Sequence, residues 1–119
     1  MIKRGEVYWV NLDPTVGAEI RKTRPALVIS NDINNVNAQT VTVLPITSSV
    51  EKVYPFEVLL EAGACGNKEA CKVKANQIRT VDRRRLGKVM GVVSPEIMAR
   101  IEKAVMLHLD LEKTRDAGA

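Results

Sequence analysis

The stretch that decides the fold is Glu19-Ile20-Arg21-Lys22-Thr23-Arg24-Pro25-Ala26-Leu27-Val28-Ile29-Ser30. Its second half, 26–29, is apolar and rich in β-branched residues, which is typical of a buried strand. Because Arg24 stands just before that strand, we expect its guanidinium to be held on rigid scaffold, where it can grip a phosphate with a two-pronged hydrogen bond. The alternative is that Arg21, Lys22 and Arg24 form an ordinary solvated loop.

Outward from this stretch, the chain consists mostly of short strands. We expect further strands at 7–12, 40–46, 56–60 and 71–75, separated by turn signals at 13–14, 34–35, 54–55 and 63–68. Strands at this spacing favour a sheet that curls into a small barrel. The 119 residues suffice for one domain, which we place at 1–111, followed by a short polar tail at 112–119.

One helix is expected at the C-terminal end. Ser94 suits the N-cap and Pro95 the first turn. An apolar stripe at helical spacing then indicates that the helix is scaffold; it consists of Ile97, Ile101, Val105 and Leu109, with Met98 beside them. His108 lies in the last turns, where a surface or satisfied core histidine is expected rather than a catalytic one.

Composition points to an acidic partner. The formal net charge is +4, and nucleic acid is the simplest partner for a basic chain. Aromatic residues make up only 3% of the chain, so it has few of the stacking platforms that single-strand binding modules without sequence preference use. We therefore expect recognition by hydrogen bonding in a pocket.

The N-terminus lacks the apolar region of a signal peptide, and no run reaches the length of a membrane span. We expect a cytoplasmic protein without membrane contact. There, Cys65 and Cys71 would stay thiols, although their spacing also allows a disulfide or half of a metal site. The only histidine is far away in sequence, so we expect neither a metal site nor a cofactor.

Blocks along almost the whole chain, from about residue 2 to 111, occur in the order of one known family. They are Lys3–Pro14, Val16–Glu19, Thr23–Asp32, Leu44–Ser48 and Asn76–Asp82. On these blocks the chain resembles the MazF/PemK-type toxins of bacterial toxin-antitoxin pairs. The resemblance implies a mainly β fold with a C-terminal helix, a small SH3-like barrel of the PemK/CcdB type, and a homodimer. It also implies a sequence-specific endoribonuclease that cuts single-stranded messenger RNA and is bound by a cognate antitoxin.

Cutting RNA without a metal requires attack of the 2′-hydroxyl on the adjacent phosphorus, and it leaves a 2′,3′-cyclic phosphate and a 5′-hydroxyl. One group must take the proton, one must protonate the leaving oxygen, and one must neutralise the phosphorane. Two histidines in one site are excluded because the chain has one, and the clustered carboxylates of a two-metal site do not occur. A set of carboxylate, arginine and hydroxyl remains.

The resemblance supplies such a set. Arg24 and Thr47 match the family's catalytic arginine and threonine, and Glu19 matches a loop glutamate implicated in the chemistry of some members. Arg24 is charged at any working pH, and the Thr47 hydroxyl can donate to a phosphate oxygen. The alternatives are an ordinary strand-end threonine for Thr47, and for Glu19 a surface partner of Lys22 or Arg21.

The resemblance also implies RNA-binding residues, which are Asn31, Ser48 and Gln77 together with Arg21 and Lys22. Single-stranded RNA exposes the base edges that such side chains can reach. The alternatives are turn caps for Asn31 and Ser48, and a strand-end amide for Gln77. The loop 15–23 is expected to be mobile and either to close over bound RNA or to yield to the antitoxin. Because 20–22 and the 65–71 insert depart from many relatives, the cleavage motif is not carried over.

One region leaves alternatives open. We expect a helical turn over 81–86, capped by Asp82 and exposing Arg83, Arg84 and Arg85, which either dock RNA or the antitoxin or form a plain solvated face. A gyrase-poisoning toxin on the same barrel would use the C-terminal helix for its target. A non-catalytic nucleic-acid-binding module is the third class.

Overall fold

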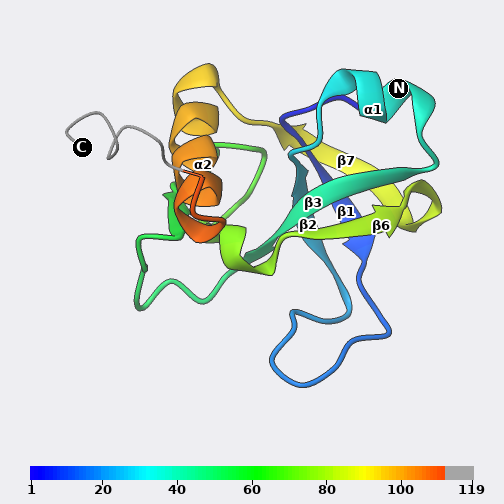
Figure 1. Cartoon of the computed structure of the whole chain (residues 1–119). Coiled ribbons are helices and arrows are strands. Elements are labelled where there is room, and N and C mark those ends of the chain that lie inside the picture. The colour runs from blue at the N-terminus through cyan, green and yellow to red at the C-terminus, as the bar shows by residue number, and fades with distance from the viewer. Residues whose placement is uncertain (112–119) are drawn as a thin grey trace.

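The computed structural model describes residues 1–111, so the polar tail expected at 112–119 lies outside the described residues. The elements, in chain order, are β1 (Glu6–Asn11), β2 (Thr23–Val28), α1 (Asp32–Asn37), β3 (Thr40–Thr47), β4 (Glu57–Leu60), β5 (Cys71–Lys74), η1 (Ala75–Gln77), β6 (Arg79–Asp82), η2 (Arg83–Arg85), β7 (Leu86–Val92) and α2 (Pro95–His108). This mainly β fold with a C-terminal helix confirms the predicted class (Figure 1). Within 1–111 no helix is both long and apolar enough to cross a membrane.

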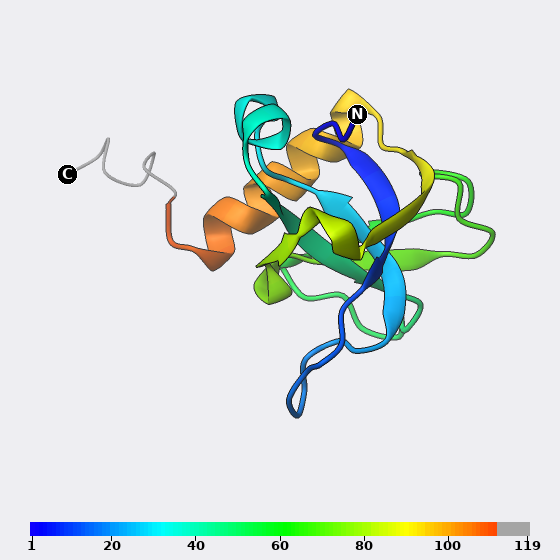
Figure 2. The ribbon, with the colours of Figure 1, turned by 90° about the vertical axis from the view of Figure 1, so that its right-hand side faces the viewer.

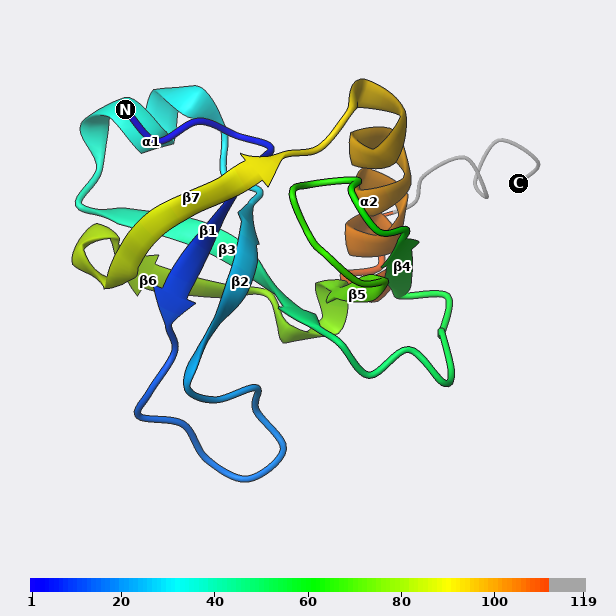
Figure 3. The ribbon, with the colours of Figure 1, turned by 180° about the vertical axis from the view of Figure 1, so that it is seen from behind.

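The strands form one antiparallel sheet in the order β4-β5-β3-β2-β1-β7, and β6 also pairs with β3 (Figure 3). Strand β3 is the centre of this arrangement. One of its edges pairs with β2, while the other pairs first with β6, along 40–43, and then with β5 at 46–47. The sheet is not closed, because no described pairing joins β7 to β4 or to β6. The predicted barrel is therefore a curled, open sheet over the part of the chain described.

Both faces of the central strands are buried. Ala26, Leu27 and Val28 are each 0% exposed, and they alternate between two hydrophobic clusters. Leu27 belongs to the cluster that α2 covers, and its two neighbours belong to the cluster on the opposite face of the sheet. Side chains of a strand point alternately to its two faces, so a continuous apolar run indicates burial on both. The prediction of a strand here is confirmed, but its bounds differ: β2 begins at Thr23, so Arg24 lies within the strand rather than before it, and Ile29 lies beyond its end.

Helix α2 lies across one side of the sheet (Figure 2). Its predicted cap is confirmed, because the Ser94 hydroxyl accepts a hydrogen bond from the backbone N–H of Ile97 at 3.2 Å. Ile101 is fully buried at the centre of the apolar stripe. The stripe ends earlier than predicted, because Leu109 follows the last helical residue and is 44% exposed. His108 is exposed in the last turn, as expected of a surface histidine.

Three elements escape the sequence pattern. Helix α1 occupies the region read as a turn at 34–35, and β6 and β7 follow the 3-10 turn η1. Strand β7 does not alternate regularly between buried apolar and exposed polar residues. Val89 and Val92 are apolar but exposed, and the pairing of β7 with β1 contains register shifts. Secondary structure in these segments is decided by neighbouring strands rather than by local pattern.

The arginine run is only partly exposed, so the prediction of three exposed arginines is wrong. The turn η2 is capped by Asp82 as predicted, since its carboxylate accepts from the Arg84 N–H at 2.8 Å. Arg83 donates to the Ala38 carbonyl at 2.8 Å, and Arg85 donates to the Asn11 and Asp13 carbonyls. Arg84 alone is exposed, and its hydrogen bonds to Asp82 lower the pKa of that carboxyl to about 2. The run fastens loops to the sheet.

Candidate active site

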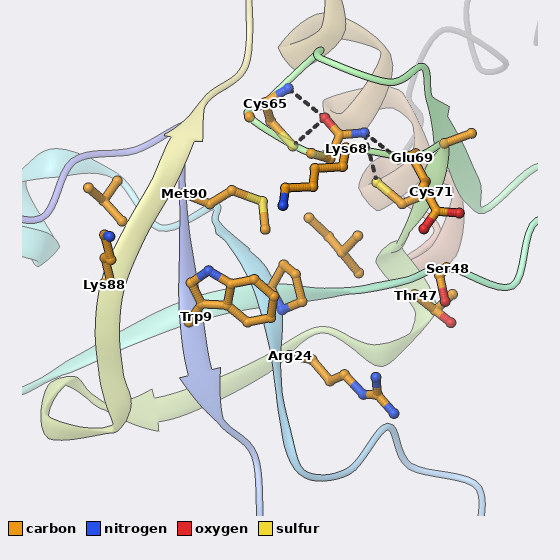
Figure 4. Close-up of a pocket in the computed structure, with 16 residues that line it drawn as sticks. Trp9, Arg24, Thr47, Ser48, Cys65, Lys68, Glu69, Cys71, Lys88 and Met90 are labelled. Atoms are coloured by element: carbon orange, nitrogen blue, oxygen red, sulfur yellow. Dashed lines mark hydrogen bonds between the residues drawn. The ribbon is translucent and has the colours of Figure 1, made fainter.

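A pocket of about 610 Å³ opens where strands β7, β1, β2 and β3 meet the loop 65–71 (Figure 4). Its apolar lining comes mainly from Trp9, Pro25, Ile46 and Met90. Its polar lining is Arg24, Thr47, Ser48, Asn67, Lys68, Glu69 and Lys88. Three basic side chains and one acidic side chain therefore face one cavity, which favours an anionic ligand.

Arg24 and Thr47 are brought together by strand register. The pairing of β2 with β3 ends at Ala26 opposite Pro45, and Arg24 and Thr47 stand two residues beyond this pair on their strands. The backbone of each is fixed from its other side as well, by pairing with Val10 and with Lys72. Side chains two residues apart on a strand point to the same face of the sheet, and both Arg24 and Thr47 line the pocket.

Both side chains are available to a ligand. Arg24 is exposed, and within 1–111 its guanidinium makes no hydrogen bond or ion pair. The Thr47 hydroxyl accepts a hydrogen bond from the backbone N–H of Ser49 at 3.2 Å, which leaves its own proton free to donate. Ser48 is exposed beside it and lines the same pocket.

Sequence reasoning missed Lys68, Lys88 and Trp9 as pocket residues. Lys68 points into the cavity near Trp9 and Met90 (Figure 4). No local signal identified these residues, because Lys88 stands in a strand that the pattern did not reveal and Lys68 in a polar loop. Trp9 was counted only as one of few aromatic residues, yet it is 40% exposed and offers the pocket a flat ring.

The wall of the pocket formed by 65–71 is organised around Asn67. Its side-chain carbonyl accepts from the Cys65 N–H at 2.9 Å and from the Cys65 thiol at 3.4 Å. Its amide nitrogen donates to the carbonyls of Glu61 and Glu69, and it lies 3.5 Å from the Cys71 sulfur. Both cysteines are free thiols, as expected.

The two thiols influence each other. The hydrogen bond from Cys71, opposed by burial and helped by the Asn67 backbone, lowers the pKa of Cys65 to about 7. The same contact with Cys65, together with burial, raises the pKa of Cys71. Cys65 is therefore the thiol that ionises first, in a pocket that also holds three cationic side chains.

Glu19 and Gln77 line a second pocket, of about 550 Å³, together with Pro14, Ala18, Asn76, Ile78 and Arg79. The Glu19 carboxylate accepts from the N–H of Val16 at 2.6 Å, so it caps its own turn. The Gln77 side chain accepts from the Ile20 N–H at 2.7 Å and donates to the Ala18 carbonyl at 3.2 Å. Gln77 thus fastens the loop between β1 and β2 to η1. The structure does not bring Glu19 into the pocket of Arg24 and Thr47.

The remaining predicted residues lie outside both pockets. The Asn31 side chain caps α1 by accepting from the Asn34 N–H at 2.8 Å, which is the turn-cap alternative. Arg21 and Lys22 are exposed in the β1–β2 loop, where the Lys22 N–H donates to Asp13 at 3.0 Å. Among residues 1–111, no three His, Cys, Asp or Glu side chains gather closely enough to hold a metal ion.

Three comparisons with known proteins agree with one another. Residues 3–109 match the family described as the PemK-like, MazF-like toxin of type II toxin-antitoxin systems. The chain is 45% identical over 116 residues to endoribonuclease MazF9 of Mycobacterium tuberculosis, a match that covers 93% of this chain and 98% of the relative. It is 36% identical over 112 residues to endoribonuclease EndoA of Bacillus subtilis, covering 93% and 97%.

Solved structures share the fold. A mycobacterial endoribonuclease in complex with its cognate antitoxin matches with a TM-score of 0.79 and 25% identity, covering 95% of this chain and 99% of that one. MazF of Deinococcus radiodurans matches with a TM-score of 0.78 and 29% identity, covering 92% and 96%. The similarity therefore extends over nearly the full length of the relatives.

Proposed function

The chain belongs to the family of PemK-like and MazF-like toxins of type II toxin-antitoxin systems, and from that membership we propose that it is a metal-independent endoribonuclease of single-stranded RNA. The observation that supports the chemistry is the meeting of Arg24 and Thr47 at the rim of one cationic pocket. As an enzyme that cuts messenger RNA, it would act in the cytoplasm.

Arg24 and Thr47 hold the reacting phosphate. In the transition state the phosphorane oxygens carry more negative charge than the ground-state phosphate does, so fixed donors stabilise the transition state selectively. The Arg24 guanidinium supplies charge and a planar pair of donors, and the Thr47 hydroxyl supplies a further donor from the facing strand. Because both stand on paired strands, the donors need little reorganisation during the reaction.

The proton of the 2′-hydroxyl needs an acceptor. Glu19 is our candidate for this base, and in the structure its carboxylate caps a turn in the second pocket. Acting at the Arg24 phosphate requires the β1–β2 loop to carry Glu19 toward bound RNA. This loop is fastened chiefly through Gln77, whose two hydrogen bonds would break when the loop moves. Loop closure over RNA would thus assemble the site.

Base recognition is assigned to residues beside the phosphate. Ser48 at the rim is suited to base edges, and Arg21 and Lys22 on the loop are suited to the RNA backbone. Gln77 would exchange its loop contacts for a base edge when the loop closes. Asn31 is already engaged as a helix cap and is the weakest member of the predicted set.

We infer that the toxin works as a homodimer and that an antitoxin competes for its RNA groove. In the described chain β7 ends the strand order and exposes Val89 and Val92, and an exposed apolar edge strand needs a cover. A mycobacterial relative was solved in complex with its cognate antitoxin, and MazF of Deinococcus radiodurans was crystallised with MazE. Sedimentation as a 13.1 kDa species at micromolar concentration would contradict the dimer.

One experiment tests the chemistry. The purified protein is incubated with a long single-stranded RNA in EDTA, and the ends of the fragments are identified. We expect cleavage that persists in EDTA and leaves 2′,3′-cyclic phosphates and 5′-hydroxyls. A substrate with 2′-deoxyribose at the cut site should resist, because it lacks the nucleophile. Fragments with 5′-phosphates would reject transesterification, and uncut RNA would favour a gyrase poison or a binding module.

A further inference from the structure

We propose that Cys65 and Cys71 are an oxidation site, and that a disulfide between them switches off the pocket of Arg24 and Thr47. The inference rests on the proposed RNA cleavage for its readout, but its chemistry can be measured without RNA. The first observation behind it is that both cysteines line this pocket, one at each end of the loop 65–71.

The two sulfurs lie on either side of one amide. The Cys65 sulfur is 3.4 Å from the side-chain oxygen of Asn67, and the Cys71 sulfur is 3.5 Å from its nitrogen (Figure 4). Both residues are buried, at 2% and 7% exposed, and the pocket that they line is the side from which a small oxidant would approach them.

Bond formation would disturb Asn67. A disulfide requires sulfurs about 2 Å apart. The amide of Asn67 is now hydrogen-bonded to both sulfurs, and it also fixes the loop by donating to the Glu61 and Glu69 carbonyls. Drawing the sulfurs together would displace this side chain and, with it, the segment that carries Lys68 into the pocket.

Formation of the disulfide would move Cys71 rather than Cys65. The backbone at 65–66 is pressed against β7, since a Cβ on Gly66 would come within 2.3 Å of the Met90 carbonyl oxygen, and one on Gly91 within 2.3 Å of the Cys65 carbonyl oxygen. Cys65 therefore has no room to retreat. Cys71 is the first residue of β5, and the next residue, Lys72, is the register partner of Thr47. Movement of Cys71 is thereby transmitted to Thr47.

The chemistry balances with hydrogen peroxide as oxidant. The Cys65 thiolate, which forms near neutral pH, attacks one peroxide oxygen; the O–O bond breaks, and a sulfenic acid and hydroxide result, the hydroxide taking up a proton to become water. The Cys71 thiol then attacks the sulfenic sulfur, the S–O bond breaks and the S–S bond forms, with release of a second water. The two electrons lost by the thiols reduce the peroxide. A dithiol reverses the reaction.

The test uses the full chain, first reduced and then treated with hydrogen peroxide. Intact mass and thiol titration after unfolding follow the cysteines, and a single-stranded RNA substrate follows the activity. We expect an intrachain disulfide, a mass lower by two hydrogens, and a cleavage rate reduced by about tenfold or more, because small displacements at a catalytic site are costly. Dithiothreitol should restore the rate.

The matched controls are Cys65→Ser, Cys71→Ser and the double variant, each compared with itself before and after peroxide, with circular dichroism as the check on folding. The double variant should keep its own reduced rate. Peroxide that forms no disulfide, a disulfide that leaves the rate unchanged, or equal inhibition of the double variant would each overturn the proposal. A reduced protein that cuts no RNA rejects the proposed function and the switch together, whereas the mass and thiol measurements still decide whether the pair oxidises.

Discussion

Arg24→Lys separates the geometry of the phosphate grip from its charge. Lysine keeps the positive charge but presents a point donor in place of the planar fork. Removal of one fixed transition-state donor costs on the order of a hundredfold in rate, which we expect for Arg24→Ala. For Arg24→Lys we expect a loss of about tenfold or more, because the two-pronged contact is gone.

The structure predicts little change in stability for either variant. Arg24 is exposed and has no side-chain partner among the described residues, so the free energy of unfolding should change by at most about 1 kcal/mol. Thr47→Val gives up the hydrogen bond from the Ser49 N–H, worth about 1 kcal/mol. These small stability costs make the kinetic effects interpretable.

The assay is single-turnover cleavage of a labelled RNA, with urea unfolding of each variant in parallel. If Arg24 and Thr47 hold the same phosphate, the variant that combines Arg24→Ala and Thr47→Val should lose much less cleavage rate than the product of the two single losses. RNA affinity should fall by less than the rate, because other basic residues still contact the RNA backbone. A folded Arg24→Ala protein that cuts at near wild-type rate would refute the assignment, as would strict multiplicativity of the two losses.

The remaining predictions concern Glu19, Gln77 and Glu57. Glu19→Gln keeps an oxygen to cap its turn, so stability should hold while single-turnover cleavage falls on the order of a hundredfold; a near wild-type rate would remove Glu19 as the base. Gln77→Ala removes the two hydrogen bonds that hold the β1–β2 loop, so hydrogen exchange at the Ile20 N–H should accelerate. The free energy of unfolding in urea should fall by about 1 to 2 kcal/mol. Unchanged exchange would contradict the role of Gln77 in holding the loop. Burial raises the pKa of Glu57, but the hydrogen bond from the Tyr54 N–H and the ion pairs with Lys72 and Lys74 outweigh burial, so the net pKa is lowered. Glu57 therefore stabilises the fold above its unfolded pKa of about 4.3. This stabilisation is lost as the pH falls through the folded pKa. Glu57→Gln should therefore cost about 3 kcal/mol near neutral pH and flatten the acid limb of the stability curve, whereas an unaltered limb would refute the pairing.

The sequence by itself determined the elements that local pattern encodes. The apolar run at 26–29, the cap at Ser94 and the stripe through Ile101 were readable because strand alternation, helix periodicity and capping depend on neighbours along the chain. The cap of η2 by Asp82 was readable for the same reason. The order of the family blocks extended this to the mainly β fold, and the comparisons confirm it.

Tertiary structure alone decided which residues share a cavity. Arg24 and Thr47 meet because of the β2–β3 register, which no local pattern specifies, whereas Glu19, closer in sequence to Arg24, faces another pocket. Lys88 reaches the site from a strand whose pairing contains register shifts.

The same holds for the two thiols. Six residues apart in the sequence, Cys65 and Cys71 flank one amide because the chain between them turns back from β7 to β5. Close approach of the backbone at Gly66 makes that path possible, and only the packed fold shows it. Contacts between residues distant along the chain depend on how strands pair and where loops return, and these are properties of the whole fold rather than of any local segment.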